Sequence, residues 1–421
     1  MHAYLLSTDH VIQPFGRPVS ETLVHNRLLG GHQEQMLRDL GCTVERIASP
    51  EQVRRLPCLL VYDDVYFTHH AMARFLKAAR RRGHSERANA RAALRTSALT
   101  ERFTPGFQGE QVEVPGTGTC RAYDCYYLTR FDPRLPASGQ ADVLPVPYRM
   151  VKVRQRTNLY FEPTGLFVVP ISRAFMTPIR HWSAAVTANL LGMTAFFCRT
   201  LRKRPWAAAT LPVRLLWRAA SLRPASLAGK FYVAGPRCRV APSAHVEGAV
   251  LGRGVRIGPH AVVRGAVIGD NSAIGPGAVV EGSTLANRVS VDSGVTLRAC
   301  VAGPGANFGN AITQFSMLGR NAVLCPDSGL IDFHLHGDVE VTLDGRRVAS
   351  GSRLLGGCLG DGAFLGPGVK ILSGQDVPNH CMLIETPRAL VRDVEGRLPE
   401  HVLRMDARNP GRPVRRRRKA S

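Results

Sequence analysis

Aliphatic residues recur at a fixed spacing through residues 233–330. Counted from Val240, the steps run six, five and six residues, so that the pattern closes every seventeen residues. Three files of aliphatic positions result: Val240, Ile257, Ile274 and Val291; Val246, Val263, Val280 and Leu297; and Leu251, Ile268 and Leu285. A fixed repeat of this kind is typical of a solenoid. We therefore predict a β-helix in which each coil contains three short strands and buries its core only against its neighbours.

A second pattern supports the solenoid. Two positions before each inward-pointing residue the side chain is never larger than Val, as a narrow shared interior requires. These positions are Ala244, Ala249, Val255, Ala261, Ala266, Ser272, Ala278, Ser283, Val289 and Val295. Residues that tolerate unusual backbone angles stand at the expected corners: Gly252, Gly258, Gly269, Gly275, Asn271 and Asn287. The alternative, a Gly- and Val-rich antiparallel sheet, is not favoured because the three files agree.

The repeat is interrupted in its second half. After Leu297 the register loosens, and we expect it to return at Ile312, Leu318 and Leu324. Residues 329–351 then break the pattern, and the Asp344-Gly345 pair inside them is a turn signal, which predicts a hairpin projecting from a corner. The solenoid is expected to resume with inward residues at Leu354, Leu359, Leu365 and Ile371. The predicted β-helix thus covers residues 233–387.

Residues 1–170 are predicted to form an α/β domain. Strand-like segments at 3–8, 42–47 and 57–68 alternate with helical segments at 31–40 and 69–83. Such alternation predicts a mostly parallel sheet, in which ligands bind beyond the carboxyl ends of the strands. Asp63 and Asp64 fall at the end of a buried strand of this kind. The Gly-rich segment 113–119 is interpreted as a surface hairpin, because no convincing helix follows it as a phosphate-binding loop would require.

Residues 171–232 are predicted to be a helical, basic linker. An apolar stripe at helical spacing consists of Trp182, Val186, Leu190, Met193, Phe197 and Leu201. Its uncharged run is short for a membrane span and contains polar residues. A helix packed on both domains is therefore the first interpretation, and a basic helix lying on a membrane surface is the alternative. Pro205, Pro212 and Pro224 are expected to break the region before the solenoid begins.

The formal net charge of +23 favours anionic ligands such as nucleotides, CoA or a membrane surface. Nucleic acid is not expected as a partner, because no recognisable nucleic-acid-binding module is present. The ten cysteines form no zinc-type pairs, and no basic-then-apolar leader opens the chain. We therefore expect a cytoplasmic protein with free thiols, with peripheral attachment to the inner face of the membrane as the alternative. Residues 388–421 form a C-terminal segment whose basic tail is interpreted as a solvated charge run; attraction to lipid or nucleic acid is the alternative.

His334 and His336 are the main candidates for catalysis. They flank Leu335 beside Asp332, at the root of the insertion. On a strand, residues two apart share a face, so Asp332 could orient an imidazole that acts as a general base. The same residues could instead bind a metal or make structural contacts. Asn307, Asn310 and Gln314 on the preceding coil are candidates to bind a sugar, and asparagine ladders at solenoid turns explain Asn307 and Asn310 equally well.

The repeats resemble those of the hexapeptide-repeat transferases. That resemblance implies a left-handed parallel β-helix and a homotrimer with active sites between adjacent subunits. It also implies transfer of an acyl group from acyl-CoA or acyl carrier protein to a sugar or amino acceptor.

The first domain, with LVYDDVYF after an alternation of strand and helix, resembles the nucleotidyltransferase domain of bacterial N-acetylglucosamine-1-phosphate uridyltransferases, which precedes a β-helix. The resemblance implies that Asp63 or Asp64 holds the Mg²⁺ of a nucleotide and that Arg17 is a substrate-binding residue. Gly16, Arg17 and Pro18 are present, but the Gly-x-Gly-Thr-Arg loop of that family is absent. Without its backbone amides to cradle a triphosphate, we expect a degenerate domain with weak or absent nucleotidyl transfer.

The expected function is acyl transfer to a nucleotide-linked or phosphorylated amino sugar, in cell-envelope precursor metabolism. Two alternatives remain at this point. One is a sugar-1-phosphate nucleotidyltransferase that uses the β-helix as a trimerisation scaffold, and the other is a non-enzymatic scaffold at a membrane surface.

Overall fold

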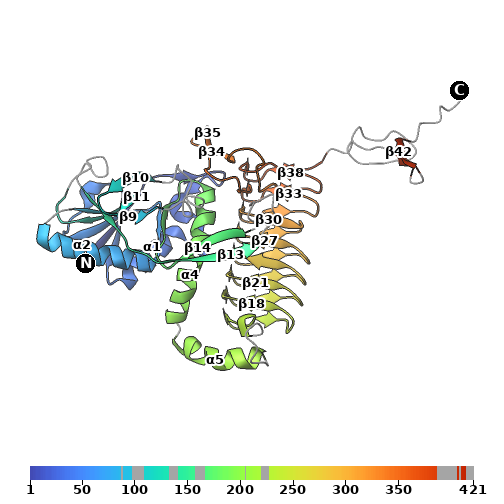
Figure 1. Ribbon diagram of the computed structural model, residues 1–421, viewed down its shortest axis with the longest axis horizontal. Coiled ribbons are helices and arrows are strands. Elements are labelled where there is room, and N and C mark those ends of the chain that lie inside the picture. The colour runs from blue at the N-terminus through green and yellow to red at the C-terminus, as the bar shows by residue number, and fades with distance from the viewer. Residues whose placement is uncertain are drawn as a thin grey trace.

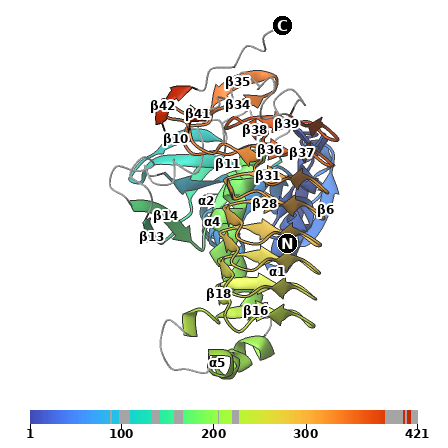
Figure 2. The same cartoon turned by 90° about the vertical axis from the view of Figure 1, so that its right-hand side faces the viewer.

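The computed structural model describes residues 1–86, 89–96, 109–131, 141–156, 166–203, 205–219, 227–385, 405–406 and 409–413. An α/β domain, a long helix and a β-helix follow one another along the chain (Figure 1). The predicted fold class, an α/β domain plus a helical linker plus a left-handed parallel β-helix, is confirmed. The helix α4 (Trp182–Lys203) lies between the two larger parts and runs alongside the stacked coils (Figure 2).

The α/β domain is built on a seven-stranded sheet. Its strands are β1 (His2–Leu6), β6 (Thr43–Ile47), β7 (Cys58–Tyr62), β9 (Ala90–Arg95), β10 (Glu110–Val114), β11 (Gly118–Leu128) and β12 (Asp142–Pro145). The order is β12-β9-β11-β7-β1-β6, with β10 paired to β11. Only β1 with β6 and β7, and β12 with β9, pair in parallel, because β11 runs antiparallel to each of its partners. Six of the seven strands therefore run in one direction and β11 alone runs against them, so the sheet is mixed, and the expectation of a mostly parallel sheet holds for every strand but β11.

Two amphipathic helices cover this sheet as their apolar spacing predicted. Met36 and Leu37 of α1 (Leu29–Asp39) and Met72 and Phe75 of α2 (His69–Glu86) are buried in one cluster with side chains of β1 and β7. The predicted hairpin at 113–119 is also present, because β10 and β11 pair antiparallel on either side of it.

Smaller elements surround the sheet. They are β2 (Val11–Ile12) paired with β3 (Arg17–Pro18), β4 (Leu23–Val24) with β5 (Arg27–Leu28), β8 (Val65–Phe67) with β15 (Met176–Pro178), β13 (Met150–Arg156) with β14 (Leu166–Ser172), and the 3₁₀ helices η1 (Val19–Glu21) and η2 (Pro50–Gln52). In the C-terminal segment, β41 (Met405–Asp406) pairs with β42 (Asn409–Pro413). The basic tail that follows lies outside the described residues.

The β-helix consists of parallel sheets that run along the stack of coils. The first contains β16 (Tyr232–Ala234), β19 (Ala249–Leu251), β22 (Val267–Ile268), β25 (Thr284–Leu285), β28 (Val301–Ala302), β31 (Met317–Leu318), β36 (Cys358–Leu359) and β39 (Asp376–Val377). The second contains β17 (Arg239–Val240), β20 (Arg256–Ile257), β23 (Ala273–Ile274), β26 (Ser290–Val291), β29 (Asn307–Phe308), β32 (Val323–Leu324), β37 (Phe364–Leu365) and β40 (Met382–Leu383). The third contains β18 (His245–Glu247), β21 (Val262–Arg264), β24 (Val279–Glu281), β27 (Thr296–Arg298) and β30 (Ile312–Gln314); above it β33 (Gly329–Leu330) pairs with β38 (Lys370–Ile371).

The strand register confirms the three predicted aliphatic files. Val240, Ile257, Ile274 and Val291 pair in succession, and the other two files do the same on their own sheets. All ten predicted small residues are buried. Two later positions differ from the prediction. Thr313, not Ile312, pairs with Leu297 and points inward, because this coil is one residue shorter. Leu354 belongs to the insertion, where it bridges Phe333.

The corner glycines serve a different purpose from the one expected. Gly252, Gly258, Gly269 and Gly275 do not adopt positive φ angles. Instead, a Cβ atom on Gly269 would lie 2.5 Å from the carbonyl carbon of Ala286 in the next coil, closer than real contacts allow. Of the two predicted asparagines, Asn271 has a positive φ of 57°, whereas Asn287 uses its side-chain oxygen to accept a hydrogen bond from the Asp270 amide.

Helix α4 joins the α/β domain to the β-helix. Trp182, Ala185 and Val186 lie in one buried cluster with Tyr66 of the α/β domain and Met317 of the β-helix. The predicted packing on both domains is thus present. Within the described chain, α4 is also the one helix long and apolar enough to cross a membrane, although 44% of its most apolar window is buried in the protein. The helix α5 (Pro205–Ala219) continues through Pro212, so this proline does not break the region as expected.

Candidate functional site

The insertion that interrupts the β-helix has a fixed root. Its hairpin consists of β34 (Glu340–Leu343) and β35 (Arg346–Ala349), which pair antiparallel. Below the hairpin, the His334 amide donates to the Arg353 carbonyl at 2.9 Å, and Arg353 Nη2 donates to the Leu335 carbonyl at 2.7 Å. The Arg353 guanidinium also lies 5.0 Å from the centre of the Phe333 ring. These contacts hold the backbone that carries His334 and His336.

Asp332 is held by the preceding coil and not by an imidazole. Gln314 Nε2 donates to Asp332 Oδ2 at 2.7 Å, and the carboxyl group is half-buried. Burial raises the pKa of Asp332, while the hydrogen bond from Gln314 and the charge of Arg298 oppose that rise. His334 and His336 are both exposed, and within the described residues neither imidazole has a hydrogen bond to Asp332. The structure therefore brings Asp332 and Gln314 together, and leaves the two imidazoles free on the adjoining surface.

The three candidate sugar-binding residues lie in different surroundings. Asn310 is fully buried, and its Nδ2 atom donates to the Ile312 carbonyl and to Thr313 Oγ1 at 2.7 and 2.8 Å. It thus fits the structural alternative, since its amide satisfies the backbone of the shortened coil. Asn307 lies on β29 in the second sheet, whereas Gln314 lies on β30 in the third. Of these three residues, Gln314 alone makes a side-chain contact at the root of the insertion.

The carboxylates of the α/β domain bind protein groups. Asp63 Oδ1 accepts hydrogen bonds from the Thr8 amide and hydroxyl at 3.0 and 2.8 Å. Asp64 is 2% exposed, and its Oδ2 accepts from Arg180 Nε at 3.2 Å. The same guanidinium donates to Asp124 Oδ2 at 3.3 Å, so that a protein cation stands between these two carboxylates.

This arrangement does not fit the Mg²⁺ site implied by the resemblance. Mg²⁺ requires near-octahedral coordination by oxygen atoms. Within the described residues, no group of three or more His, Cys, Asp or Glu side chains is placed to hold a metal ion. Asp63 is turned toward Thr8, and Arg180 already neutralises Asp64.

Asp64 should make stability depend on pH. Burial raises the pKa of this carboxyl from 3.8 to about 6. The contribution of Asp64 to the free energy of unfolding is therefore fully present at pH values below its pKa in the unfolded chain. It is lost as the pH rises through about 6, its pKa in the folded chain. Two pKa units correspond to roughly 3 kcal/mol. We expect Asp64→Asn to gain stability relative to the wild type between about pH 4.5 and about pH 7.5, by up to roughly 3 kcal/mol in urea titrations. A difference that is the same at both pH values would contradict the raised pKa.

Arg17 contacts the β-helix. Its guanidinium forms an ion pair with Asp361, whose other oxygen accepts from the Arg320 amide at 2.8 Å. A narrow cavity of about 90 Å³ adjoins the pair, between residues 12–28 and the coils. Arg17 thus anchors the α/β domain to the solenoid. The guanidinium group that the resemblance assigns to substrate binding is paired with Asp361 in this structure.

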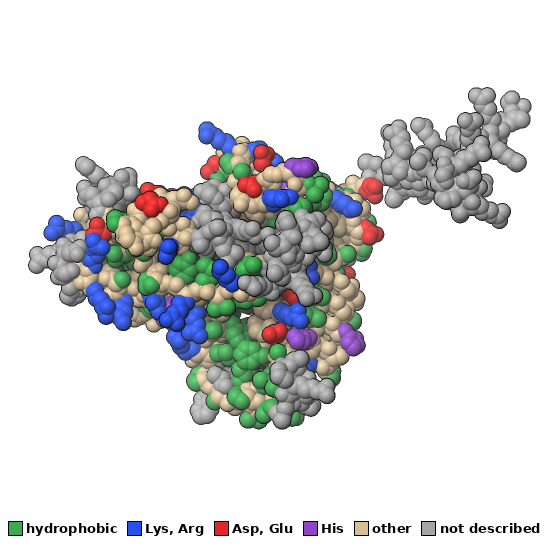
Figure 3. Space-filling model, viewed as in Figure 1, with side chains coloured by type: hydrophobic (Ala, Val, Ile, Leu, Met, Phe, Trp, Pro, Cys, Tyr) green, Lys and Arg blue, Asp and Glu red, His purple; other side chains and the backbone are tan. Residues whose placement is uncertain are grey.

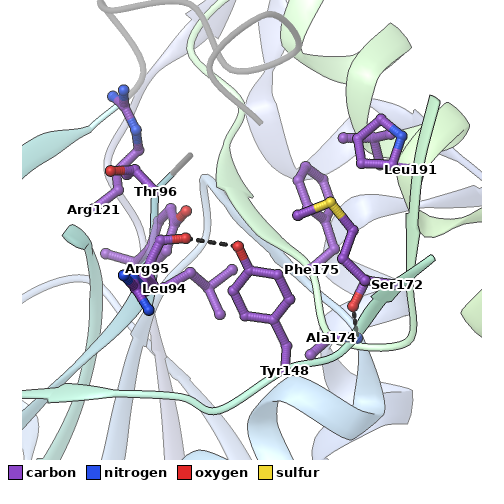
Figure 4. A pocket seen from close by; sticks show the side chains of 12 residues that line it. Leu94, Arg95, Thr96, Arg121, Tyr148, Ser172, Ala174, Phe175 and Leu191 are labelled. Atoms are coloured by element: carbon purple, nitrogen blue, oxygen red, sulfur yellow. Dashed lines mark hydrogen bonds between the residues drawn. The ribbon is translucent and has the colours of Figure 1, made fainter. Parts of the chain in front are cut away.

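A second small cavity lies beside α4. Its walls come from β9, β11, β14 and the Phe175 region, and Tyr148 donates from its hydroxyl to the Arg95 carbonyl at 2.7 Å across one side (Figure 4). Its volume is about 40 Å³, which is space for a few water molecules. It is too small for a nucleotide or an acyl carrier.

The largest of the three cavities was missed in the sequence. It has a volume of about 600 Å³ and is lined by basic residues from the end of α4 and by the start of α2. The signal in the sequence is the group of cations Arg199, Arg202 and Lys203, which helps to make the linker helix basic. Nothing in the sequence indicated that they face His69 and His70, because these residues are far apart along the chain.

Comparison with known proteins finds one family model that matches part of the chain and solved structures that are similar to part of it. A family model described as the GMPPB C-terminal domain matches residues 214–317. No curated protein sequence matches the chain. Among solved structures, a mutant of GDP-perosamine N-acetyltransferase from Caulobacter crescentus, in complex with CoA and GDP-perosamine, is 18% identical over 37% of this chain and 51% of its own, with a TM-score of 0.14. A second mutant of the perosamine N-acetyltransferase of that organism, with the same ligands, is 19% identical over the same shares, with a TM-score of 0.14. The matched part spans about half the length of those chains, and the family match covers the start of the β-helix and leaves the α/β domain outside it.

Proposed function

We propose that this protein is an acyltransferase that acts on a nucleotide-linked or phosphorylated amino sugar, with acyl-CoA or acyl carrier protein as the donor. The observation that carries the proposal is the root of the insertion, where two exposed imidazoles stand on a hydrogen-bonded backbone beside the Gln314–Asp332 pair. A rigid repeat scaffold with a single functional insertion is a common way to build such a site. The similarity of residues 214–317 to the C-terminal domain of GMPPB supports the solenoid part of the proposal.

The chemistry requires one base and a place for the developing negative charge. The amine of the sugar attacks the thioester carbonyl, and a new carbon–nitrogen bond forms while the carbon–sulfur bond breaks. His334 or His336 accepts the proton that the amine loses, and that proton is then available to the leaving thiolate. An imidazole is suited to this role because its ordinary pKa lies near neutral pH. Asp332 and Gln314 act as positioning residues, since they hold the insertion root against the preceding coil.

The direct test is release of free thiol from acetyl-CoA in the presence of amino-sugar phosphates and nucleotide-linked amino sugars. Thiol release that depends on the amino sugar is expected, with the acylated sugar as the second product. Absence of transfer with each donor and acceptor class would contradict the proposal and favour a scaffold role. The nucleotidyltransferase alternative is not favoured, because Arg180 stands between Asp64 and Asp124 where a cation would be required.

We also propose that three chains assemble around the β-helix. Ile312, Ile331 and Leu372 are 50%, 39% and 67% exposed and lie on or next to β30, β33 and β38, on the side of the solenoid that carries the insertion root. Outward-facing aliphatic residues this large are expected to be covered by another protein surface. A threefold assembly would cover them and place the corner between neighbouring chains.

Light scattering should therefore give a mass three times the 45.9 kDa of one chain. Leu372→Asp should lower that mass, because a charge would be buried without a partner. The matched control is Val151→Asp, on β13 in the α/β domain, where the side chain is 65% exposed and the assembly should be unaffected. A wild-type monomer at micromolar concentration would contradict the assembly.

A further inference from the structure

A basic cleft lies on the α/β side of α4, away from the insertion corner. It has a volume of about 600 Å³, within the range of sites that enclose small organic ligands. Its walls come from the end of α1, the first residues of α2, Arg173 after β14, and the last two turns of α4. Figure 3 shows Lys and Arg side chains gathered where the lower end of α4 meets the α/β domain.

The charge of this basic cleft is unbalanced. Its described lining includes one acidic side chain, Asp39, and four cationic side chains: Arg173, Arg199, Arg202 and Lys203. Asp39 already accepts hydrogen bonds from Arg199 and, at 2.7 Å, from Lys203 Nζ. Within the described chain, the guanidinium groups of Arg173 and Arg202 have no ion pair. Two cations therefore remain available to an anionic ligand.

The start of α2 adds to the positive potential. His69 and His70 form the first turn of this helix of 18 residues and line the cleft. The partial positive charge of a helix N-terminus attracts phosphate groups. Burial lowers the pKa of both imidazoles, and nearby cations lower it further, with Arg199 acting on His69 and Arg74 and Arg173 on His70.

The floor of the basic cleft is apolar and contains a buried imidazole. Met36, Tyr66 and Phe196 line it beside His32. His32 is 3% exposed; its Nε2 contacts the Phe67 carbonyl at 2.9 Å, while its Nδ1 has no hydrogen-bond partner among the described residues. A buried polar atom without a partner is uncommon and is a group that a ligand can satisfy.

We propose that the basic cleft binds an organic phosphate. Arg173, Arg202 and the N-terminus of α2 hold the phosphate oxygens, and the organic part lies on the partly exposed ring of Phe196. The arginine forks suit phosphate geometry, and the aromatic floor suits a planar ring. This site is separate from the corner where acyl transfer is proposed, and it is tested by binding alone, so that failure of one proposal leaves the other standing.

The experiment is calorimetric titration of the full chain with inorganic pyrophosphate and with UDP. Both should bind, and UDP should bind more tightly because its ring gains the aromatic floor. The double variant Arg173→Gln with Arg202→Gln should weaken both by about 10-fold or more, since each charge-assisted hydrogen bond contributes that much. Phe196→Ala should weaken UDP by roughly 10-fold and leave pyrophosphate unchanged. The matched control is Arg54→Gln, an exposed arginine of the same domain that lies outside the cleft.

Each outcome decides the matter. Unchanged binding in the double variant would overturn the site. So would a wild type that binds neither UDP nor pyrophosphate and does not bind vesicles that contain phosphatidic acid. Equal loss of UDP and pyrophosphate in Phe196→Ala would overturn the aromatic part. Vesicles of phosphatidylcholine with phosphatidic acid provide a further arm. If they bind the wild type but not the double variant, while UDP does not bind, the phosphate belongs to a lipid headgroup. Thermal melts of all variants confirm that they fold.

Discussion

Replacing Trp182 with Ala is expected to lower the free energy of unfolding by about 3–5 kcal/mol. Its side chain is 0% exposed and belongs to the cluster that joins the α/β domain, α4 and the β-helix. The change would leave a cavity at the junction of all three parts. It would also remove the donor that Nε1 provides to Asp376, a carboxyl whose pKa burial raises to about 6. Urea or guanidinium titration, followed by far-UV circular dichroism, measures the loss.

Two variants separate the effect of packing from that of tryptophan as such. Trp182→Phe keeps most of the ring but leaves Asp376 without its donor, so a smaller loss of about 1–3 kcal/mol is expected. Trp217→Ala on α5 removes a tryptophan that is 82% exposed and should change stability by no more than about 0.5 kcal/mol. If Trp182→Ala were as stable as Trp217→Ala, the junction would not be a source of stability.

Replacing His334 with Ala is expected to reduce acyl-transfer turnover by about 10²-fold or more, if this imidazole is the general base. The melting temperature should hardly change, because the side chain is exposed and contributes little packing. Turnover is measured as thiol release from acyl-CoA at saturating amino sugar. The loss should appear in turnover and not in the concentration of acceptor needed for half saturation.

His336→Ala is the matched comparison, because that side chain is equally exposed on the same segment. If His336 is the base, the loss should appear there and not at His334. His260→Ala, at an exposed corner far from the insertion along the chain, should have no effect. Turnover preserved in both His334→Ala and His336→Ala would remove the insertion root from the chemistry.

The β-helix could be predicted from sequence because its core is local. Each inward residue packs against residues one coil away, so a seventeen-residue period records the packing directly, as the pairing of Val240 with Ile257 shows. Prediction failed where one residue was lost from a coil. The shortened coil turns Thr313 inward and Ile312 outward, and the fully buried Asn310 donates to the Ile312 carbonyl. The periodic pattern does not indicate that Thr313 takes the inward position, because the neighbouring Ile312 is the more apolar residue.

The candidate site was only partly predictable. The expectation that Asp332 would orient His334 relied on strand geometry, in which residues two apart share a face. In the structure β33 ends at Leu330, so the rule does not apply to the segment that follows. Asp332 is held by Gln314, and the spacing of residues around Asp332 did not indicate that partner. The basic cleft could not be predicted from the sequence, because its residues come from several segments that meet only in the folded chain.

The junction between the two large parts also has a consequence for synthesis on the ribosome. Asn379 Nδ2 donates to the Phe15 carbonyl across 364 positions of the chain, and Trp182 reaches Asp376 across 194. Neither contact can form until almost the whole described β-helix has left the exit tunnel. The side of α4 that packs on the coils stays uncovered until β28 and β31 are added, and the final contacts of the junction wait for the last coils. Until then the nascent chain exposes apolar surface of the kind that makes folding intermediates prone to aggregate.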